Sequence, residues 1–297
     1  MPRCARRYAD DAMKGAPPNA MRAVVIVSAT VLLAVAASAA GCASARPPPA
    51  GANGAQRPPR VDDETAFAST VRFRGSSDCT GVLVAPAWVL TAAHCVAGVS
   101  TLPSVAATGP HGVLTREIDS CAMHPRAFGG STRCQEERSR DAIEAVAPAH
   151  DLALVHLASP FAASEVTPIA WASHEPRSIA HARVRVMSWL PNEITGDSPQ
   201  RIAGWNEVTH AGEGAMVTVP IAVDGRDRVS TQPGDSGSPA LLEIDGEIRV
   251  VGVLSGGSAP YAVDSVFAET FEAENAQWIR RLTVPASVSA DGEGGVE

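Results

Sequence analysis

Three short segments carry the residue types of a nucleophilic catalyst. They are LTAAHC at 90–95, HDLAL at 150–154 and GDSGSP at 234–239. The hydroxyl of Ser236 is a poor nucleophile at neutral pH and needs a base that takes its proton. The imidazole of His94 suits that task because its ordinary pKa lies near neutrality. A carboxylate such as Asp151 would orient the ring, so the set predicts acyl-transfer chemistry.

Each segment alone is weak evidence. A histidine beside a cysteine is more often a packed core residue, an aspartate that opens a strand is more often a cap, and Gly-Asp-Ser-Gly suits any turn. The informative feature is the combination, with His94, Asp151 and Ser236 in that order along one region. Glycines beside the serine would also let backbone N–H groups approach a developing oxyanion.

The region that holds these segments is typical of an all-β fold. Short runs of continuous or alternating apolar residues recur between turn residues, for example at 82–84, 152–155, 184–187 and 217–219. The segment LLEIDGEIRVV at 241–251 predicts a hairpin, because Asp-Gly supplies the positive φ angles of a two-residue turn. Only residues 272–282 predict a helix, with Trp278, Ile279 and Leu282 on one face. The pattern leaves a sandwich or barrels open.

Composition narrows the class of protein. The chain has 297 residues, of which 45% are hydrophobic, which is enough for a sizeable core. The formal net charge of −8 argues against non-specific binding of nucleic acid.

Residues 1–42 are typical of an N-terminal extension and an export signal. Met21-Arg22 is followed by an apolar run and then by small residues up to Cys42. An uncleaved membrane span is the alternative, because the run has about the minimum length. The ending AAGC resembles a bacterial lipobox, which implies a lipidated Cys42 and membrane attachment, although Ala39 stands where that motif usually has leucine. Cleavage after Ala39 would instead release a secreted protein. Both routes place the domain outside the cytoplasm, in the periplasm or at the cell surface.

A proline-rich linker at 43–60 and a small, acidic tail at 284–297 flank the domain. Four cysteines remain in it: Cys79, Cys95, Cys121 and Cys134. An even count in an exported domain predicts two disulfides, and three pairings are open. A zinc site is disfavoured because no C-x-x-C spacing occurs.

Together, these segments resemble the chymotrypsin/trypsin family of serine endopeptidases over residues 61–283. The segment CTGVLV at 79–84 with WVLTAAHC at 88–95 is similar to the family's stretch around the catalytic histidine, and VGVLSGG at 251–257 is similar to its substrate-binding strand. The resemblance implies two six-stranded antiparallel β-barrels, with the active site between them and a C-terminal helix. It also implies a Cys79–Cys95 disulfide and an oxyanion hole formed by the N–H groups of Gly234 and Ser236.

Several positions depart from the family pattern. Ser238 replaces the second glycine after the nucleophile, Gly256 stands where an aromatic is common, and the disulfide that often braces the specificity pocket is absent because Gln232 is not cysteine. We expect Cys121 to pair with Cys134 and close an inserted loop. The family's activation signature is also missing. The nearest match is Arg60-Val61, whose cleavage would give Asp235 a new N-terminus as partner. The alternative is an internal partner for Asp235 and no activation cleavage.

Motif counting places Ser230 at the base of the primary specificity pocket, with Ser255 and Gly257 on the substrate strand and Gly257 at the rim. Family members that cleave after arginine or lysine usually have aspartate at the base, so Ser230 predicts neutral side chains before the scissile bond. An inward-turned Asp264 on the far wall would instead restore a preference for basic residues.

The sequence therefore predicts an exported, monomeric serine endopeptidase that acts on proteins or peptides without a metal or cofactor. Two alternatives are a catalytically silent relative used for binding and an esterase or acyl hydrolase that uses the same triad.

Overall fold

The computed structural model describes residues 68–75, 79–101, 103–190, 200–223, 231–232, 234–257 and 264–284. The predicted signal with Cys42, the linker at 43–60, the Arg60-Val61 pair, Ser230 and the tail beyond 284 lie outside these residues. No helix within the described ranges is long and apolar enough to cross a membrane.

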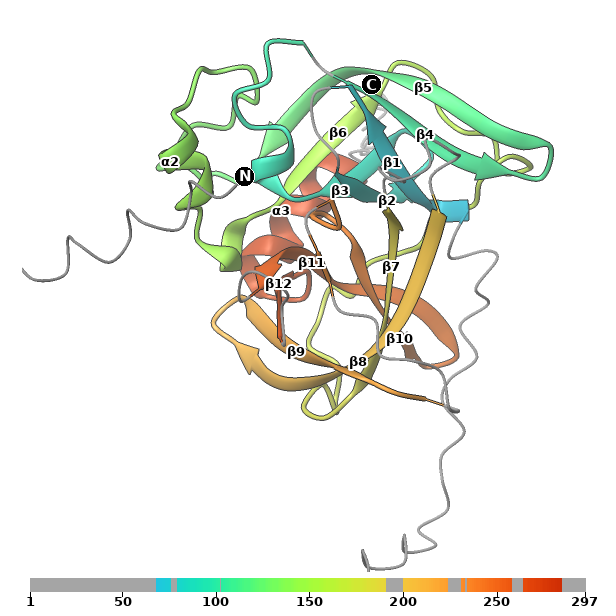
Figure 1. Ribbon diagram of the computed structural model, residues 1–297, viewed down its shortest axis with the longest axis vertical. Helices are drawn as coiled ribbons and strands as arrows, with labels where there is room; N and C mark the ends of the chain where they lie inside the picture. The colour runs from blue at the N-terminus through green and yellow to red at the C-terminus, as the bar shows by residue number, and fades with distance from the viewer. Residues whose placement is uncertain are drawn as a thin grey trace, which may run out of the picture. The chain divides into compact units, whose positions relative to one another are not determined.

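Six antiparallel strands close into an N-terminal barrel (Figure 1). They are β1 (Thr70–Arg74), β2 (Thr80–Ala85), β3 (Trp88–Thr91), β4 (Ser104–Gly109), β5 (Gly112–Met123) and β6 (Ala153–Leu157). The order around the barrel is β1-β2-β3-β6-β5-β4. The apolar run at 82–84 is fully inside, which explains why it does not alternate with polar residues.

Six further antiparallel strands form the C-terminal barrel, in the order β10-β11-β12-β9-β8-β7. They are β7 (Arg183–Leu190), β8 (Gln200–Gly212), β9 (Ala215–Ile221), β10 (Pro239–Ile244), β11 (Glu247–Gly257) and β12 (Ser265–Glu269). In β9 buried and half-buried positions alternate strictly, as expected for a strand with one face in the core. The predicted all-β fold with two six-stranded barrels is confirmed.

Turn chemistry explains where these strands reverse. Asp245 and Gly246 both have positive φ, 53° and 81°, at the predicted β10–β11 hairpin. The β8–β9 hairpin turns at Glu213 and Gly214, which also have positive φ. Of that second hairpin, the sequence pattern predicts only the strand at 217–219, because β8 is rich in polar residues.

Short helices and one longer helix complete the described chain. The 3-10 turns η1 (Ala93–Cys95) and η2 (Pro148–His150) and the helix α2 (Arg140–Glu144) lie between strands of the first barrel. The helix α3 (Ala273–Thr283) confirms the one helix predicted from sequence. The Glu272 side chain accepts a hydrogen bond from the Asn275 amide at its start, and Trp278 and Ile279 are buried in a core shared by both barrels.

Two disulfides are present, and both are the predicted pairs. Cys79 and Cys95 join the start of β2 to η1, with Cα atoms 6.1 Å apart. Cys121 on β5 and Cys134 in the loop before α2 have Cα atoms 6.3 Å apart. Both separations lie within the usual range for disulfides. The first disulfide fixes the turn that carries His94.

Candidate active site

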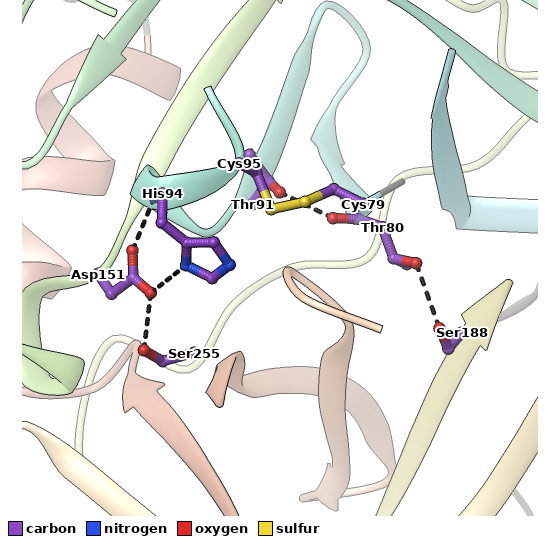
Figure 2. Close-up of a disulfide and its surroundings, with 8 residues drawn as sticks. All are labelled: Cys79, Thr80, Thr91, His94, Cys95, Asp151, Ser188 and Ser255. Atoms are coloured by element: carbon purple, nitrogen blue, oxygen red, sulfur yellow. Dashed lines mark hydrogen bonds and ion pairs between the residues drawn. A yellow bond between two sulfur atoms is a disulfide. The ribbon is translucent and has the colours of Figure 1, made fainter. Parts of the chain in front are cut away.

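His94 and Asp151 are held together by two hydrogen bonds (Figure 2). His94 lies on η1 and Asp151 follows η2, so two short turns bring them to one end of the first barrel. The His94 amide donates to Asp151 Oδ1 at 3.0 Å, and His94 Nδ1 lies 2.6 Å from Asp151 Oδ2. The Asp151 side chain is fully buried, whereas 21% of the His94 side chain is exposed.

A third bond to Asp151 comes from the other barrel. The hydroxyl of Ser255 on β11 donates to Asp151 Oδ2 at 2.7 Å (Figure 2). Ser255 is one of the residues predicted for the substrate pocket, and its hydroxyl bonds to the carboxylate of Asp151. The bond ties the substrate strand of the C-terminal barrel to the histidine–aspartate pair of the N-terminal barrel.

These contacts prepare the His94 ring to accept a proton. An ionised carboxylate only accepts hydrogen bonds, so Nδ1 carries the hydrogen and Nε2 keeps its lone pair. Burial alone would lower the pKa of His94. The hydrogen bond with Asp151 and the charge of that carboxylate act in the opposite direction, and the pKa of His94 is raised above its ordinary 6.5.

The loop with Ser236 is attached to both barrels. The carbonyl of Ser236 accepts from the amide of Thr80 on β2 at 2.8 Å. On the other side, the Gly237 amide donates to Leu254 O at 2.8 Å, next to Ser255. Thr80 adjoins the disulfide beside His94, so the loop is anchored close to both members of the pair. No hydrogen bond joins the Ser236 hydroxyl to His94 within the described residues, and such bonds often tighten only when substrate binds.

Glycine is required on both sides of Ser236. Gly234 and Gly237 have φ of 102° and 83°, in the region that favours glycine. A Cβ on Gly237 would also overlap the Thr80 carbonyl oxygen and the Thr91 hydroxyl. The amides of Gly237 and Ser238 donate to Leu254 O and Asp235 O, whereas those of Gly234 and Ser236 make no backbone hydrogen bond with the described part of the chain.

Asp235 has an internal partner that the sequence did not name. Its side chain is buried, and its Oδ1 accepts from the hydroxyl of Ser188 on β7 at 2.5 Å. Its Oδ2 accepts from the Gln232 amide at 2.8 Å. Nothing in the sequence around Ser188 marks it, because the contact depends on how β7 is placed against the loop.

Of the residues predicted to line a specificity pocket, Ser255, Gly257 and Asp264 lie in the described ranges. Gly256 and Gly257 are exposed at the end of β11, and Gly257 pairs with Ser265 on β12. Asp264 is half-buried directly before Ser265. The buried hydroxyls of Thr231 and Ser265 lie 2.8 Å apart. A side chain at Gly256 would point into open space, so its absence leaves this strand end uncovered.

One group of three possible metal ligands occurs in the described ranges, namely Cys79, His94 and Cys95. The two sulfur atoms form the disulfide, and zinc binds thiolates rather than disulfide sulfur. The grouping is therefore explained by the disulfide beside His94.

The chain has two closed antiparallel barrels, and the His94–Asp151 pair of one is bonded to Ser255 of the other. This architecture is that of the chymotrypsin-like class of folds. The sequence matches the family model described as Trypsin over residues 59–279, and the chain belongs to that family.

Two solved structures share this fold. One is neuropsin, a serine protease expressed in the limbic system of mouse brain, with a TM-score of 0.53 at 19% sequence identity. The match covers 73% of this chain and 95% of neuropsin. The other is human heparin binding protein, with a TM-score of 0.54 at 18% identity, covering 73% of this chain and 91% of that one.

Proposed function

We propose that this protein is a serine endopeptidase with Ser236 as nucleophile, His94 as base and Asp151 as the orienting carboxylate. The observation that carries the proposal is the bonding around Asp151. Three hydrogen bonds from two barrels hold one buried carboxylate against Nδ1 of His94. A protein that only binds its partner needs no such arrangement.

The chemistry follows from these contacts. The Ser236 oxygen attacks the carbonyl carbon of the scissile bond while its proton passes to Nε2 of His94. Asp151 stabilises the imidazolium that forms. The N–H groups of Gly234 and Ser236 bind the oxyanion. His94 then gives its proton to the leaving amine, and water releases the acyl group by the same steps in reverse.

The decisive experiment is reaction with a fluorophosphonate probe, followed by assay on peptide substrates. We expect the purified domain to be labelled at Ser236. Ser236→Ala and His94→Ala should lower kcat/KM by several orders of magnitude without changing the fold. Ser238→Ala is the matched control, because the Ser238 hydroxyl is buried and has no partner among the described residues.

The outcomes separate the alternatives. If the folded domain is not labelled, the result supports the alternative of a catalytically silent binding protein of this family. Labelling with turnover of esters but not of peptides would indicate an acyl hydrolase instead. Peptidase activity that survives in Ser236→Ala would contradict the proposal outright.

We also propose that the domain is exported and attached to a membrane through a lipidated Cys42. The support is the apolar run and the small residues before Cys42, together with two disulfides, which persist in oxidising compartments. Mass spectrometry of the mature N-terminus tests it. A diacylglyceryl Cys42 is expected, free cleavage after Ala39 would leave a secreted protein, and an intact Met1 in cytoplasm would contradict export.

For substrates, we propose a preference for neutral side chains before the scissile bond. The support is Ser230 at the position where many relatives have aspartate, together with the uncharged hydroxyl pair of Thr231 and Ser265. A cleavage profile on a peptide library measures it. A strong preference for arginine or lysine that disappears in Asp264→Asn would show that Asp264 sets specificity.

A further inference from the structure

Among the described residues, the buried carboxylate of Asp235 is bonded only to uncharged donors. Its side chain is 1% exposed, and its two oxygens accept from the Ser188 hydroxyl and the Gln232 amide. Carboxylates that are this deeply buried usually have a cation beside them. Within the described residues, no arginine, lysine or histidine forms an ion pair with Asp235.

The donor from β7 belongs to a short chain of hydroxyls that crosses between the barrels. Ser188 is 2% exposed, and its oxygen lies 3.2 Å from the hydroxyl oxygen of Thr80 on β2 (Figure 2). A serine has one hydroxyl hydrogen, and that of Ser188 is directed to Asp235. Thr80 therefore donates to Ser188. Because the Thr80 amide also holds the Ser236 carbonyl, one residue of β2 contacts the catalytic loop by two routes.

The position of Asp235 sets the position of the loop. Its amide donates to Gln232 O at 3.0 Å, and its carbonyl accepts from the Ser238 amide at 2.9 Å. Asp235 also lies between Gly234 and Ser236, whose N–H groups are assigned to the oxyanion hole. A rotation of this residue would redirect both N–H groups.

The electrostatics agree with a bond to a neutral partner. Burial raises the pKa of Asp235, while the hydrogen bonds from Ser188 and from the Gln232 amide lower it. Hydrogen bonds to a charged group are the stronger kind, so the contact with Ser188 offsets part of the cost of burying the carboxylate.

We propose that Ser188 is the positioning residue that holds Asp235, and with it the Gly234–Ser236 loop, in its working conformation. This proposal rests on the endopeptidase function proposed above, and it concerns how that activity is regulated. Asp235 does not need the new amino terminus that cleavage after Arg60 would create at Val61. The hydroxyl of Ser188 on β7 already bonds to its carboxylate. The unprocessed chain is therefore competent.

The test uses the full chain with Arg60→Ala, which blocks cleavage after residue 60. Two readouts are measured in parallel: the rate of fluorophosphonate labelling, and hydrogen exchange at the Gly237 and Ser238 amides. We expect both to equal those of the chain cleaved at that bond. If the two amides become protected, and labelling begins, only after cleavage, the inference is overturned.

A second set of variants tests Ser188 itself. Ser188→Ala should slow labelling roughly tenfold or more and speed exchange at the two amides by a similar factor. Ser188→Thr keeps the hydroxyl and should restore most of both. The matched control is Thr270→Val, which removes another buried hydroxyl of the C-terminal half, one that donates to Val250 O at 2.7 Å. Equal results for Ser188→Ala and Thr270→Val would refute the role of Ser188.

The two readouts keep the proposals separate. Exchange at Gly237 and Ser238 depends on the loop and not on catalysis. Loss of amide protection in Ser188→Ala supports the inference, and unchanged protection contradicts it. Both results can be read even if the protein never reacts with the probe, which would contradict only the proposed function.

Discussion

Asp151 and Asp235 are two buried aspartates, one bonded to His94 and one next to Ser236 in sequence, and their partners differ. Asp151 accepts from the amide and the ring of His94 and from Ser255. Asp235 accepts from one hydroxyl and one amide. Among the described residues, only Asp151 has a partner that can take up a proton, namely His94. Similar burial of the same residue type thus gives one carboxylate bonded to an imidazole and one bonded to a hydroxyl and a loop amide, which suits the two different roles proposed for them.

The two carboxylates also share one kind of hydrogen bond. In each, a serine of the C-terminal barrel, Ser255 or Ser188, donates its hydroxyl to the carboxylate. In each, the contact leads to the N-terminal barrel, directly to Asp151 in one case and through Thr80 in the other. The active site is therefore assembled by hydrogen bonds between the barrels as well as by their apolar core.

The largest expected effect comes from removing the charge at the proton-transfer site. Asp151→Asn should lower kcat on the order of 10⁴-fold, because an amide nitrogen facing Nδ1 favours the wrong tautomer of His94. Steady-state assays measure this, with circular dichroism as the check on folding. Asp235→Asn should cost less, because no proton moves at that site. A larger loss for Asp235→Asn than for Asp151→Asn would reverse the comparison.

A buried histidine close to Asp151 in the first barrel should make that barrel sensitive to acid. The residue is His124, whose backbone amide donates to the carbonyl of Leu152. His124 is fully buried, stacks on His150 at 4.9 Å, and has its Nε2 without a partner among the described residues. Burial, followed by the charge of His150, lowers the pKa of His124 to about 4.

Because the folded pKa of His124 is depressed, the unfolded chain binds the proton first. Stability is therefore lost as pH falls from about 6.5 to about 4, by at most about 3 kcal/mol. Chemical denaturation at a series of pH values measures this slope. His124→Phe keeps the stacking and should flatten the slope. An unchanged slope in that variant would assign the acid sensitivity to other groups.

A smaller effect compares the two serine donors directly. Ser255→Ala leaves Asp151 with two hydrogen bonds, whereas Ser188→Ala leaves Asp235 with one. We therefore expect Ser188→Ala to slow fluorophosphonate labelling more than Ser255→Ala. The double variant should be close to additive, since the two carboxylates share no partner. The reverse ranking would mean that Asp151 depends on Ser255 more than its bond count suggests.

The smallest effect is a shift in pH dependence. The pKa of His94 is raised, and only neutral His94 can act as a base. The rise of kcat/KM with pH should therefore have its midpoint above 6.5, and Asp151→Asn should move the midpoint down. A midpoint below 6.5 in the unaltered protein would contradict the bonding between His94 and Asp151.

Local patterns predicted much of this molecule. The motifs around His94, Asp151 and Ser236 are contiguous, the Asp245-Gly246 turn specifies its hairpin, and the helix at 272–282 has a clear apolar face. Those features depend on neighbours in sequence, so the sequence displays them.

Contacts between distant strands could not be predicted in the same way. Ser188 is 47 residues from Asp235 and 108 from Thr80, so its role appears only when β7 is placed against β2. The bond between Ser255 and Asp151 joins residues 104 positions apart and could not be predicted for the same reason. No local pattern reports which way a strand residue faces a second barrel.

Both disulfides lie in the half of the molecule that carries His94 and Asp151, and the chain has no cysteine after Cys134. Reducing conditions would thus break covalent bonds in one half only. They would loosen the base and its carboxylate directly, and they would weaken one anchor of the serine loop, the Thr80 amide next to Cys79. Under the function proposed above, activity would then follow the redox potential of the surroundings, low in a thiol-rich compartment and restored once the disulfides are oxidised.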